Sequence, residues 1–124
     1  MIYADKGKEQ EQFISFVEQA LSILAEENYA AFLTLFDSSR LEEQDLILAL
    51  KYLDESRSVV KIDNPIQIKC DNQIVDIHSY NDASGYWMDY DLTTDGEPND
   101  LTIQIEFLKK EEGYLVVLDD LHTL

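Results

Sequence analysis

The residues that could bind a metal ion or act as nucleophiles are few and widely spaced. The chain contains one cysteine, Cys70, and two histidines, His78 and His122. None of them stands in the CxxC, HxxxH or HExxH spacing that directs two ligands to one zinc ion. The four glycines are far apart, so the sequence has neither a phosphate-binding loop nor a dinucleotide-binding fingerprint. We therefore expect no metal, no cofactor and no catalytic residue, and we interpret the histidines as structural.

Carboxylates are the abundant reactive groups. The chain has 26 Asp and Glu against nine Lys and Arg, for a net charge of −17. The 39 residues between Lys69 and Lys109 contain nine carboxylates and no Lys or Arg. The acidic segment from Asp89 to Asp100 has neither the ligand spacing nor the flanking helices of an EF-hand. Paired carboxylates for acid/base catalysis arise by chance in so acidic a chain, so we do not expect an enzyme.

The charge excludes two classes of partner. Binding to DNA or RNA depends on Lys and Arg that neutralise phosphates, and an anionic membrane surface repels an acidic protein. An acidic surface without local compensation also lowers stability by self-repulsion, which favours a functional purpose. The simpler alternative is that high net charge keeps a small protein soluble.

The sequence indicates a cytoplasmic protein. A single cysteine permits no intramolecular disulfide, as is common in reducing compartments. Residues 1–30 lack the apolar core of a secretory signal, and no run of 18 apolar residues predicts a transmembrane helix.

The elements that would position the carboxylates change character near Asn64. Before it, apolar residues recur at helical spacing from Glu9 to Leu24. Asn28 is a suitable cap for a short helix over residues 29–36. Ser39 and Glu42 have the spacing of a capping box, which predicts a third helix over residues 41–53.

After Asn64 the sequence is typical of strands, rich in β-branched and aromatic residues that alternate. Tyr86 and Met88 would lie on one face, with Trp87 and Asp89 on the other. The segment TTDGEPND reads as a longer connection. The predicted strands are residues 66–70, 74–80, 85–92, 101–108 and 113–121.

These patterns predict an α+β fold in which N-terminal helices pack on a curved, mainly antiparallel sheet of four or five strands. The chain is expected to form a single domain over residues 1–124, with a helical half over 1–57 and a strand half over 59–124. Trp87 is expected to lie within or beside the packed interface.

The C-terminal third resembles a family of small uncharacterised bacterial domains. The resemblance rests on Trp87, on Asp91-Leu92-Thr93-Thr94 with Gly96-Glu97, on Asn99-Asp100-Leu101-Thr102, and on Asp120-Leu121-His122-Thr123-Leu124. The N-terminal pattern E-x-N-Y-x-A-F-x-x-L-F is similar to the start of cystatin-like (nuclear transport factor 2-like) cones. Domains of both kinds occur among immunity proteins that neutralise polymorphic bacterial toxins, including those of contact-dependent growth inhibition. The resemblance implies no catalytic residues.

Two hypotheses for function follow. The first is an immunity protein that binds a cognate, cationic, nuclease-type toxin domain, since an acidic surface complements a phosphate-binding one and speeds association. A DNA mimic acting in transcription would differ only in its target. The residues predicted to bind the toxin domain are Asp89, Asp91, Asp95, Glu97 and Asp100. The alternative is a small-ligand or acid/base domain with a pocket between helices and sheet, lined by Trp87, Tyr90, Asp89 and His78.

Overall fold

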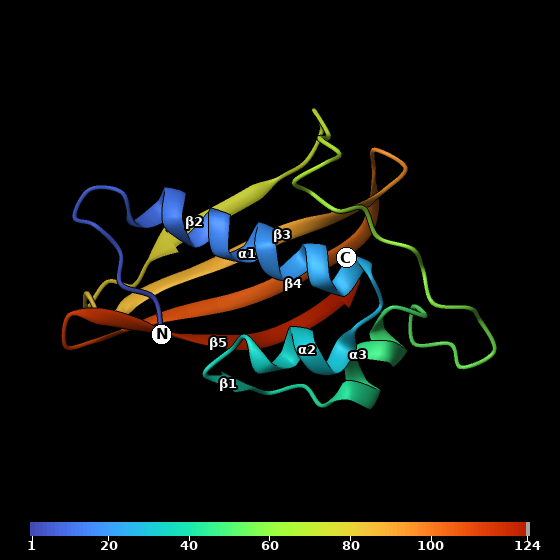
Figure 1. Ribbon diagram of the computed structural model, residues 1–124, viewed down its shortest axis with the longest axis horizontal. Coiled ribbons are helices and arrows are strands. Elements are labelled where there is room, and N and C mark those ends of the chain that lie inside the picture. Colours follow the sequence, from blue (N-terminus) through green and yellow to red (C-terminus); the bar gives the residue numbers. More distant parts are fainter. Residues whose placement is uncertain (124) are drawn as a thin grey trace.

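A computed structural model describes residues 1–123 and has two layers, with helices on one face of a five-stranded sheet (Figure 1). The elements, in chain order, are α1 (Glu9–Ala25), α2 (Tyr29–Thr34), β1 (Ser38–Ser39), α3 (Glu43–Ala49), β2 (Val75–Ser79), β3 (Gly85–Thr94), β4 (Glu97–Lys110) and β5 (Gly113–Thr123). The predicted α+β fold with N-terminal helices is confirmed.

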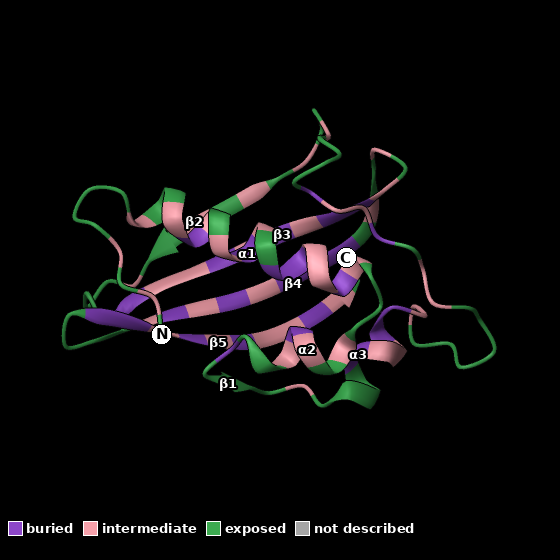
Figure 2. Ribbon diagram, in the orientation of Figure 1, coloured by how far each residue is buried: buried purple, intermediate pink, exposed green. Residues whose placement is uncertain are grey.

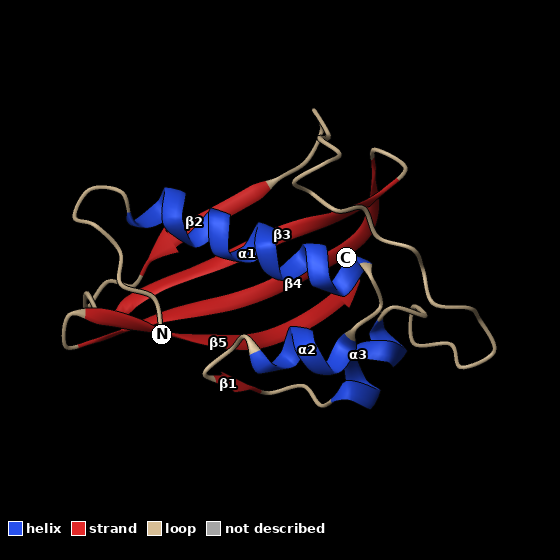
Figure 3. Cartoon of the chain, in the orientation of Figure 1, coloured by secondary structure: helices blue, strands red, loops and turns tan. Residues whose placement is uncertain are grey.

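The strands lie in the order β1-β5-β4-β3-β2, and every neighbouring pair is antiparallel except β1 with β5. The helices all cover the same face, as Figure 3 shows. Along β3 and β4 the buried residues alternate with half-buried ones (Figure 2), because successive side chains of a strand point to opposite faces. In β3, the predicted alternation places Tyr86 and Met88 on the face toward the helices. Trp87 and the Asp89 carboxylate lie on the opposite face.

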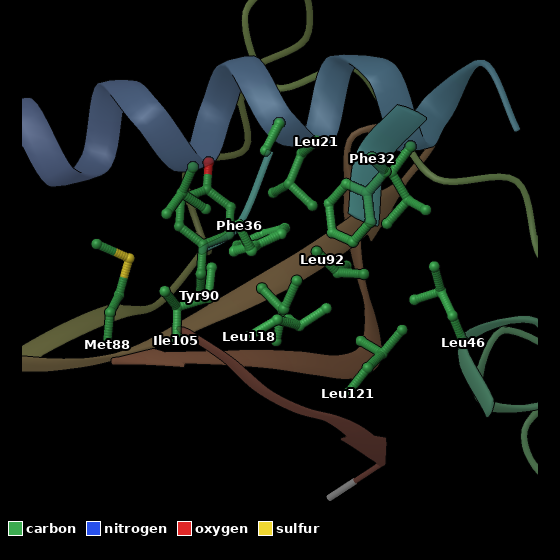
Figure 4. Packing of buried hydrophobic residues seen from close by; sticks show 14 of the residues in the cluster. Leu21, Phe32, Phe36, Leu46, Met88, Tyr90, Leu92, Ile105, Leu118 and Leu121 are labelled. Atoms are coloured by element: carbon green, nitrogen blue, oxygen red, sulfur yellow. The ribbon is translucent and has the colours of Figure 1, made fainter. Parts of the chain in front are cut away.

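The core fills the space between α1 and the sheet (Figure 4). The apolar stripe of α1 supplies Phe13, Val17 and Leu21, which are buried. Phe13 stacks on Phe107 of β4 with ring centroids 4.1 Å apart. Burial of such side chains stabilises the fold by about 1.5–3 kcal/mol each. The long amphipathic helix is therefore held by the sheet, as its periodicity predicted.

The short helices follow the sequence with one correction. The Asn28 side chain accepts a hydrogen bond from the Ala31 N–H and caps α2, as predicted. The predicted cap of the third helix was wrong: Glu42, and not Ser39, forms the capping box, with Asp45. The Ser39 hydroxyl instead bonds the backbone of Leu41. Because Ser38 and Ser39 pair with β5, α3 begins later and spans only Glu43–Ala49.

The predicted strand over residues 66–70 is wrong. The Asn64 side chain accepts a hydrogen bond from the Ile66 N–H, and the Asn64 carbonyl accepts from Gln67 and Ile68. These bonds form a turn, since an Asn side chain competes with a strand partner for the backbone donors. Figure 3 shows a connection without strands between α3 and β2. The strand half therefore begins at Val75.

The segment TTDGEPND is not a long loop. Thr94 of β3 pairs directly with Glu97 of β4, so only Asp95 and Gly96 form the turn. Both have positive φ, of 52° and 81°, which fits a two-residue hairpin turn with an Asp-Gly sequence. The β3–β4 hairpin consequently extends further than the periodicity suggested, and it carries Asp95 and Glu97 at its end.

Candidate functional site on the open face of the sheet

The face of the sheet opposite the helices is called here the open face. The register places Asp76 of β2 opposite Asp89 of β3, and Asp89 opposite Gln104 of β4. Gln104 is in turn opposite Asp120 of β5. Directly opposed residues share a face, so these four side chains form one row across the open face.

A second row lies beside the first. It contains His78, Trp87, Glu106 and Val117, one from each of β2 to β5. The His78 and Trp87 rings stack with centroids 4.5 Å apart and an interplanar angle of 25°. The single tryptophan of the chain thus lies on the open face, half-buried, and not in the core between helices and sheet.

Carboxylates dominate the open face. The two rows and their neighbours contain Asp76, Asp89, Asp91, Glu106, Asp119 and Asp120. Arg40 is the basic side chain that forms ion pairs with them, to Glu106 and to Asp119. Since one guanidinium balances only one negative charge, most of this surface is uncompensated.

Arg40 lies in the segment between β1 and α3. Because Arg40 N–H bonds the Leu118 carbonyl, the residue is held at the edge of β5. Its guanidinium reaches the Glu106 carboxylate at 3.1 Å through Nη2 and the Asp119 carboxylate at 2.8 Å through Nη1. Asp119 is accessible there because the β4–β5 register shifts next to it, between Gln104 and Ile105. The pairing of β1 with β5 therefore creates this contact.

Tyr80 completes the cluster from the other edge of the sheet. Its hydroxyl donates a 2.6 Å hydrogen bond to the second oxygen of Glu106. Burial, and then this bond and the negative charge of Glu106, raise the pKa of the Tyr80 phenol well above its ordinary value of 10.0. Tyr80 is thus a neutral donor at neutral pH, and it cannot serve there as a base.

A cavity of about 400 Å³ lies at the centre of the open face. Its polar lining is Gln104 together with the cluster of Arg40, Glu106, Asp119 and Tyr80, and Trp87 contributes an aromatic wall. Volumes of this size accommodate a small ligand or one large side chain of a partner. The cavity combines a flat apolar surface with carboxylates, which suits a planar cation.

Asp76 and Asp89 form a like-charge pair. They lie directly opposite each other in the β2–β3 ladder, an arrangement that lowers stability. One Asp89 oxygen, Oδ1, is buried and has no hydrogen-bond partner among the described residues. Asp91 differs, because the Thr102 hydroxyl donates a 2.9 Å hydrogen bond to it. The open face therefore contains a carboxylate whose bonding capacity is unused.

The five residues predicted from sequence to bind a partner fall into two groups. Asp89 and Asp91 lie on the open face, half-buried. Asp95, Glu97 and Asp100 are exposed and lie toward the end of the β3–β4 hairpin. The distance along the strands separates this hairpin group from the cavity, so the two groups need not contact one partner side chain.

The end of the hairpin is held by a residue from the connection after α3. Asp63 accepts hydrogen bonds from the Thr93 hydroxyl at 2.8 Å, the Asp95 N–H at 2.9 Å and the Gly96 N–H at 2.8 Å. This carboxylate satisfies backbone donors of the turn. The hairpin carboxylates are therefore presented on an anchored turn.

Sequence reasoning missed part of the cluster. Alternation along β4 places Glu106 on the same face as Gln104, so the pattern could have identified it. Arg40 and Tyr80 had no such signal, since Arg40 is 66 residues from Glu106 and Tyr80 is 26 residues from it. Only strand order brings these side chains together.

The predicted pocket between helices and sheet is corrected in one respect. Tyr90 points toward α1, where its hydroxyl bonds Glu18 at 3.1 Å, and it is buried in the core. Trp87, Asp89 and His78 lie on the open face. Since Tyr90 is separated from the other three by the sheet itself, the four residues cannot line one pocket.

The other candidate ligands are dispersed. Among residues 1–123, no three His, Cys, Asp or Glu side chains are grouped so that they could hold a metal ion. His122 Nδ1 lies 3.3 Å from an Asp120 oxygen, at the end of the first row.

Across residues 1–123, no helix is both long enough and apolar enough to cross a bilayer.

The family model described as "Domain of unknown function (DUF7668)" matches residues 21–124, and the chain belongs to this family. No curated protein matches the sequence significantly. No solved structure matches it significantly. The match covers α2, α3 and the whole sheet, and with them the residues of the open face.

Proposed function

We propose that this member of the DUF7668 family is an immunity protein that binds a cationic, nuclease-type toxin domain and blocks it. The observation that carries the proposal is the charge of the open face, which has six carboxylates and one arginine, Arg40, that forms ion pairs with two of them. A protein surface that binds phosphates presents Lys and Arg, so it is complementary to such a face. The binding requires no catalytic residue of the immunity protein.

The position of the charge supports a protein partner. The carboxylates lie on a broad sheet face and on an adjoining hairpin, whereas the space between helices and sheet is filled by apolar side chains (Figure 4). A filled core with carboxylates at the surface fits recognition of another macromolecule better than enclosure of a small ligand. Charge complementarity would also speed association with a toxin that must be captured quickly.

Two groups of carboxylates could meet the toxin, and they have different expected effects. Asp89 and Asp91 are half-buried, so a Lys or Arg paired with them would be largely desolvated. Asp95, Glu97 and Asp100 are exposed and would act mainly as rim charges. Removing a desolvated pair costs about 2–5 kcal/mol, whereas loss of a rim charge mainly slows association.

The test is a titration against the products of the genes adjacent to this one, beginning with the C-terminal domain of any large secreted protein among them. The wild type is compared with Asp89→Lys/Asp120→Lys on the open face and with Asp95→Lys/Glu97→Lys/Asp100→Lys on the hairpin. We expect the open-face variant to bind about 30-fold more weakly or worse, and the hairpin variant to associate more slowly with a smaller salt dependence.

The control for net charge is Glu11→Lys/Glu26→Lys, which changes the charge by the same amount as the open-face variant but on exposed positions of α1 and its end. It should retain most of the affinity. Unchanged binding by both the open-face and hairpin variants would contradict the proposed surface and direct attention to Glu42, Glu43 and Asp45. Failure of the wild type to bind any neighbouring gene product would contradict the immunity function.

A further inference from the structure

The central cavity of the open face already binds one guanidinium, that of Arg40. Two nitrogens of Arg40 contact two different carboxylates, Glu106 and Asp119. The carboxylate side chains are mostly enclosed, with 18% and 28% of their surface exposed, whereas 66% of Arg40 is exposed. The acceptors are thus part of the cavity, and the cation approaches them from the solvent side.

The geometry favours a guanidinium over an ammonium. Glu106 and Asp119 come from neighbouring strands, and a single planar fork contacts both. The Tyr80 hydroxyl is bonded to the other Glu106 oxygen, which orients this carboxylate toward the cavity. An ammonium is a point charge and does not match two acceptors in this fixed arrangement as well.

Trp87 provides a surface that Arg40 does not use. The two cation–π contacts of the described residues lie elsewhere, on Tyr52 and Tyr114. Trp87 is opposite Glu106 in the β3–β4 ladder, lines the same cavity and is braced by the stacked His78 ring. A guanidinium that enters the cavity next to Glu106 can stack on the indole.

We propose that the cavity binds an arginine side chain of the cationic partner, and that Arg40 occupies its carboxylates in the free protein until that arginine replaces it. The inference rests on the proposed function, whose partner surface it specifies. The exchange is favourable because the exposed Arg40 ion pairs contribute little. The incoming guanidinium forms equivalent ion pairs and adds contact with Trp87. The partner's body then excludes water from them, which strengthens each pair.

Trp87 allows this to be tested without the toxin, since it is the single tryptophan and lines the cavity. The probe is a peptide of four arginines separated by glycines, and the matched control replaces each arginine by citrulline, which keeps the shape and removes the charge. A third peptide contains lysines. We expect saturable change of Trp87 fluorescence with the arginine peptide, weaker change with lysine and none with citrulline.

Two variants of the protein separate the cavity from the general charge of the face. Glu106→Gln keeps an acceptor for Tyr80 but removes a charge, and should weaken binding of the arginine peptide about tenfold or more. Arg40→Gln removes the competing guanidinium and should strengthen binding. Glu11→Gln, at an exposed position of α1, changes the charge as Glu106→Gln does and should have little effect.

The outcomes of these experiments separate arginine binding in the cavity from general attraction to the acidic face. Calorimetric binding of the arginine peptide without a Trp87 response, or with equal loss in Glu106→Gln and Glu11→Gln, would overturn the binding of arginine in the cavity and leave the acidic-face proposal intact. Weaker binding by Arg40→Gln would overturn the exchange. Absence of arginine-peptide binding would also overturn this inference, whereas the toxin titration above decides the proposed function separately.

Discussion

The Tyr80 hydroxyl donates a 2.6 Å hydrogen bond to Glu106 of β4, although Tyr80 follows β2 and β3 lies between β2 and β4. Tyr80 directly follows β2 and is held beside β3 at Gly85. Gly85 accepts the Tyr80 N–H through its carbonyl and pairs with Leu108 of β4. A Cβ atom on Gly85 would lie 2.0 Å from the Phe107 carbonyl oxygen, so the close approach of β3 and β4 requires glycine.

We expect Tyr80→Phe to lower the free energy of unfolding by about 1 kcal/mol, because a part-buried hydrogen bond to Glu106 is lost. Urea denaturation measures the change. Tyr3→Phe is the matched control, since Tyr3 is 71% exposed, and it should have no measurable effect. Equal stability of Tyr80→Phe and Tyr3→Phe would contradict a structural role for the bond.

Alkaline pH should destabilise the protein through Tyr80 and Tyr90. Burial raises the pKa of both phenols well above 10.0, followed by the bond to Glu106 for Tyr80 and by the charge of Glu18 for Tyr90. A phenol whose pKa is higher in the folded protein than in the unfolded chain stabilises the fold. This stabilisation is fully present below the pKa of the unfolded chain, near 10, and is lost as the pH rises above that value. Urea midpoints from pH 9 to 11.5 should fall, and the fall should be smaller in Tyr80→Phe. A flat profile would contradict the raised pKa values.

Asp89→Asn should stabilise the protein. The substitution removes the negative charge opposite Asp76 and puts a neutral amide where one buried Asp89 oxygen has no hydrogen-bond partner. Opposed charges in a sheet typically destabilise by a few tenths of a kcal/mol to about 1 kcal/mol. Thermal unfolding measures the gain, with Asp71→Asn, at an exposed turn, as the control for charge alone. A loss of stability in Asp89→Asn would mean that the carboxylate has a favourable partner in the fold.

Asp63→Ala should loosen the end of the β3–β4 hairpin. Asp63 accepts hydrogen bonds from one hydroxyl and two backbone N–H groups of the turn. The loss should be about 1–3 kcal/mol, and amide exchange should accelerate at Asp95 and Gly96. Glu97→Ala, on the same hairpin, should leave both measurements unchanged. Slow exchange at the turn in Asp63→Ala would show that the strands alone hold it.

Phe13→Ala and Trp87→Ala should differ strongly in stability. Phe13 is fully buried and stacked on Phe107, so its removal should cost about 3–5 kcal/mol. Trp87 is half-buried on the open face, and its removal should cost only about 1 kcal/mol. Comparable losses would indicate that Trp87 supports the core. The larger effect of Trp87→Ala is expected on binding of the arginine peptide, measured by calorimetry.

Local patterns were sufficient for much of the fold. The apolar stripe from Glu9 to Leu24 corresponds to α1, because an amphipathic helix buries its apolar face against the core. Alternation in residues 85–92 and 101–108 placed Met88 and Ile105 toward the helices and Trp87 and Glu106 away from them. It failed at residues 66–70, where Asn64 holds a turn by bonds that alternation does not reveal. The Asp-Gly sequence of residues 95 and 96 is typical of a two-residue hairpin turn, although the segment TTDGEPND was interpreted as a long connection.

By itself the sequence determined that a helical layer covers an antiparallel sheet and that acidic residues alternate outward along its strands, since both depend on neighbours in the chain. Only the tertiary structure decided which of these residues form a site. The parallel pairing of β1 with β5 brings Arg40 to Asp119, and the order β4-β3-β2 brings Tyr80 across β3 to Glu106. Such contacts depend on strand order and register, which are set by packing of the whole sheet against α1 and not by the spacing of residues along one strand.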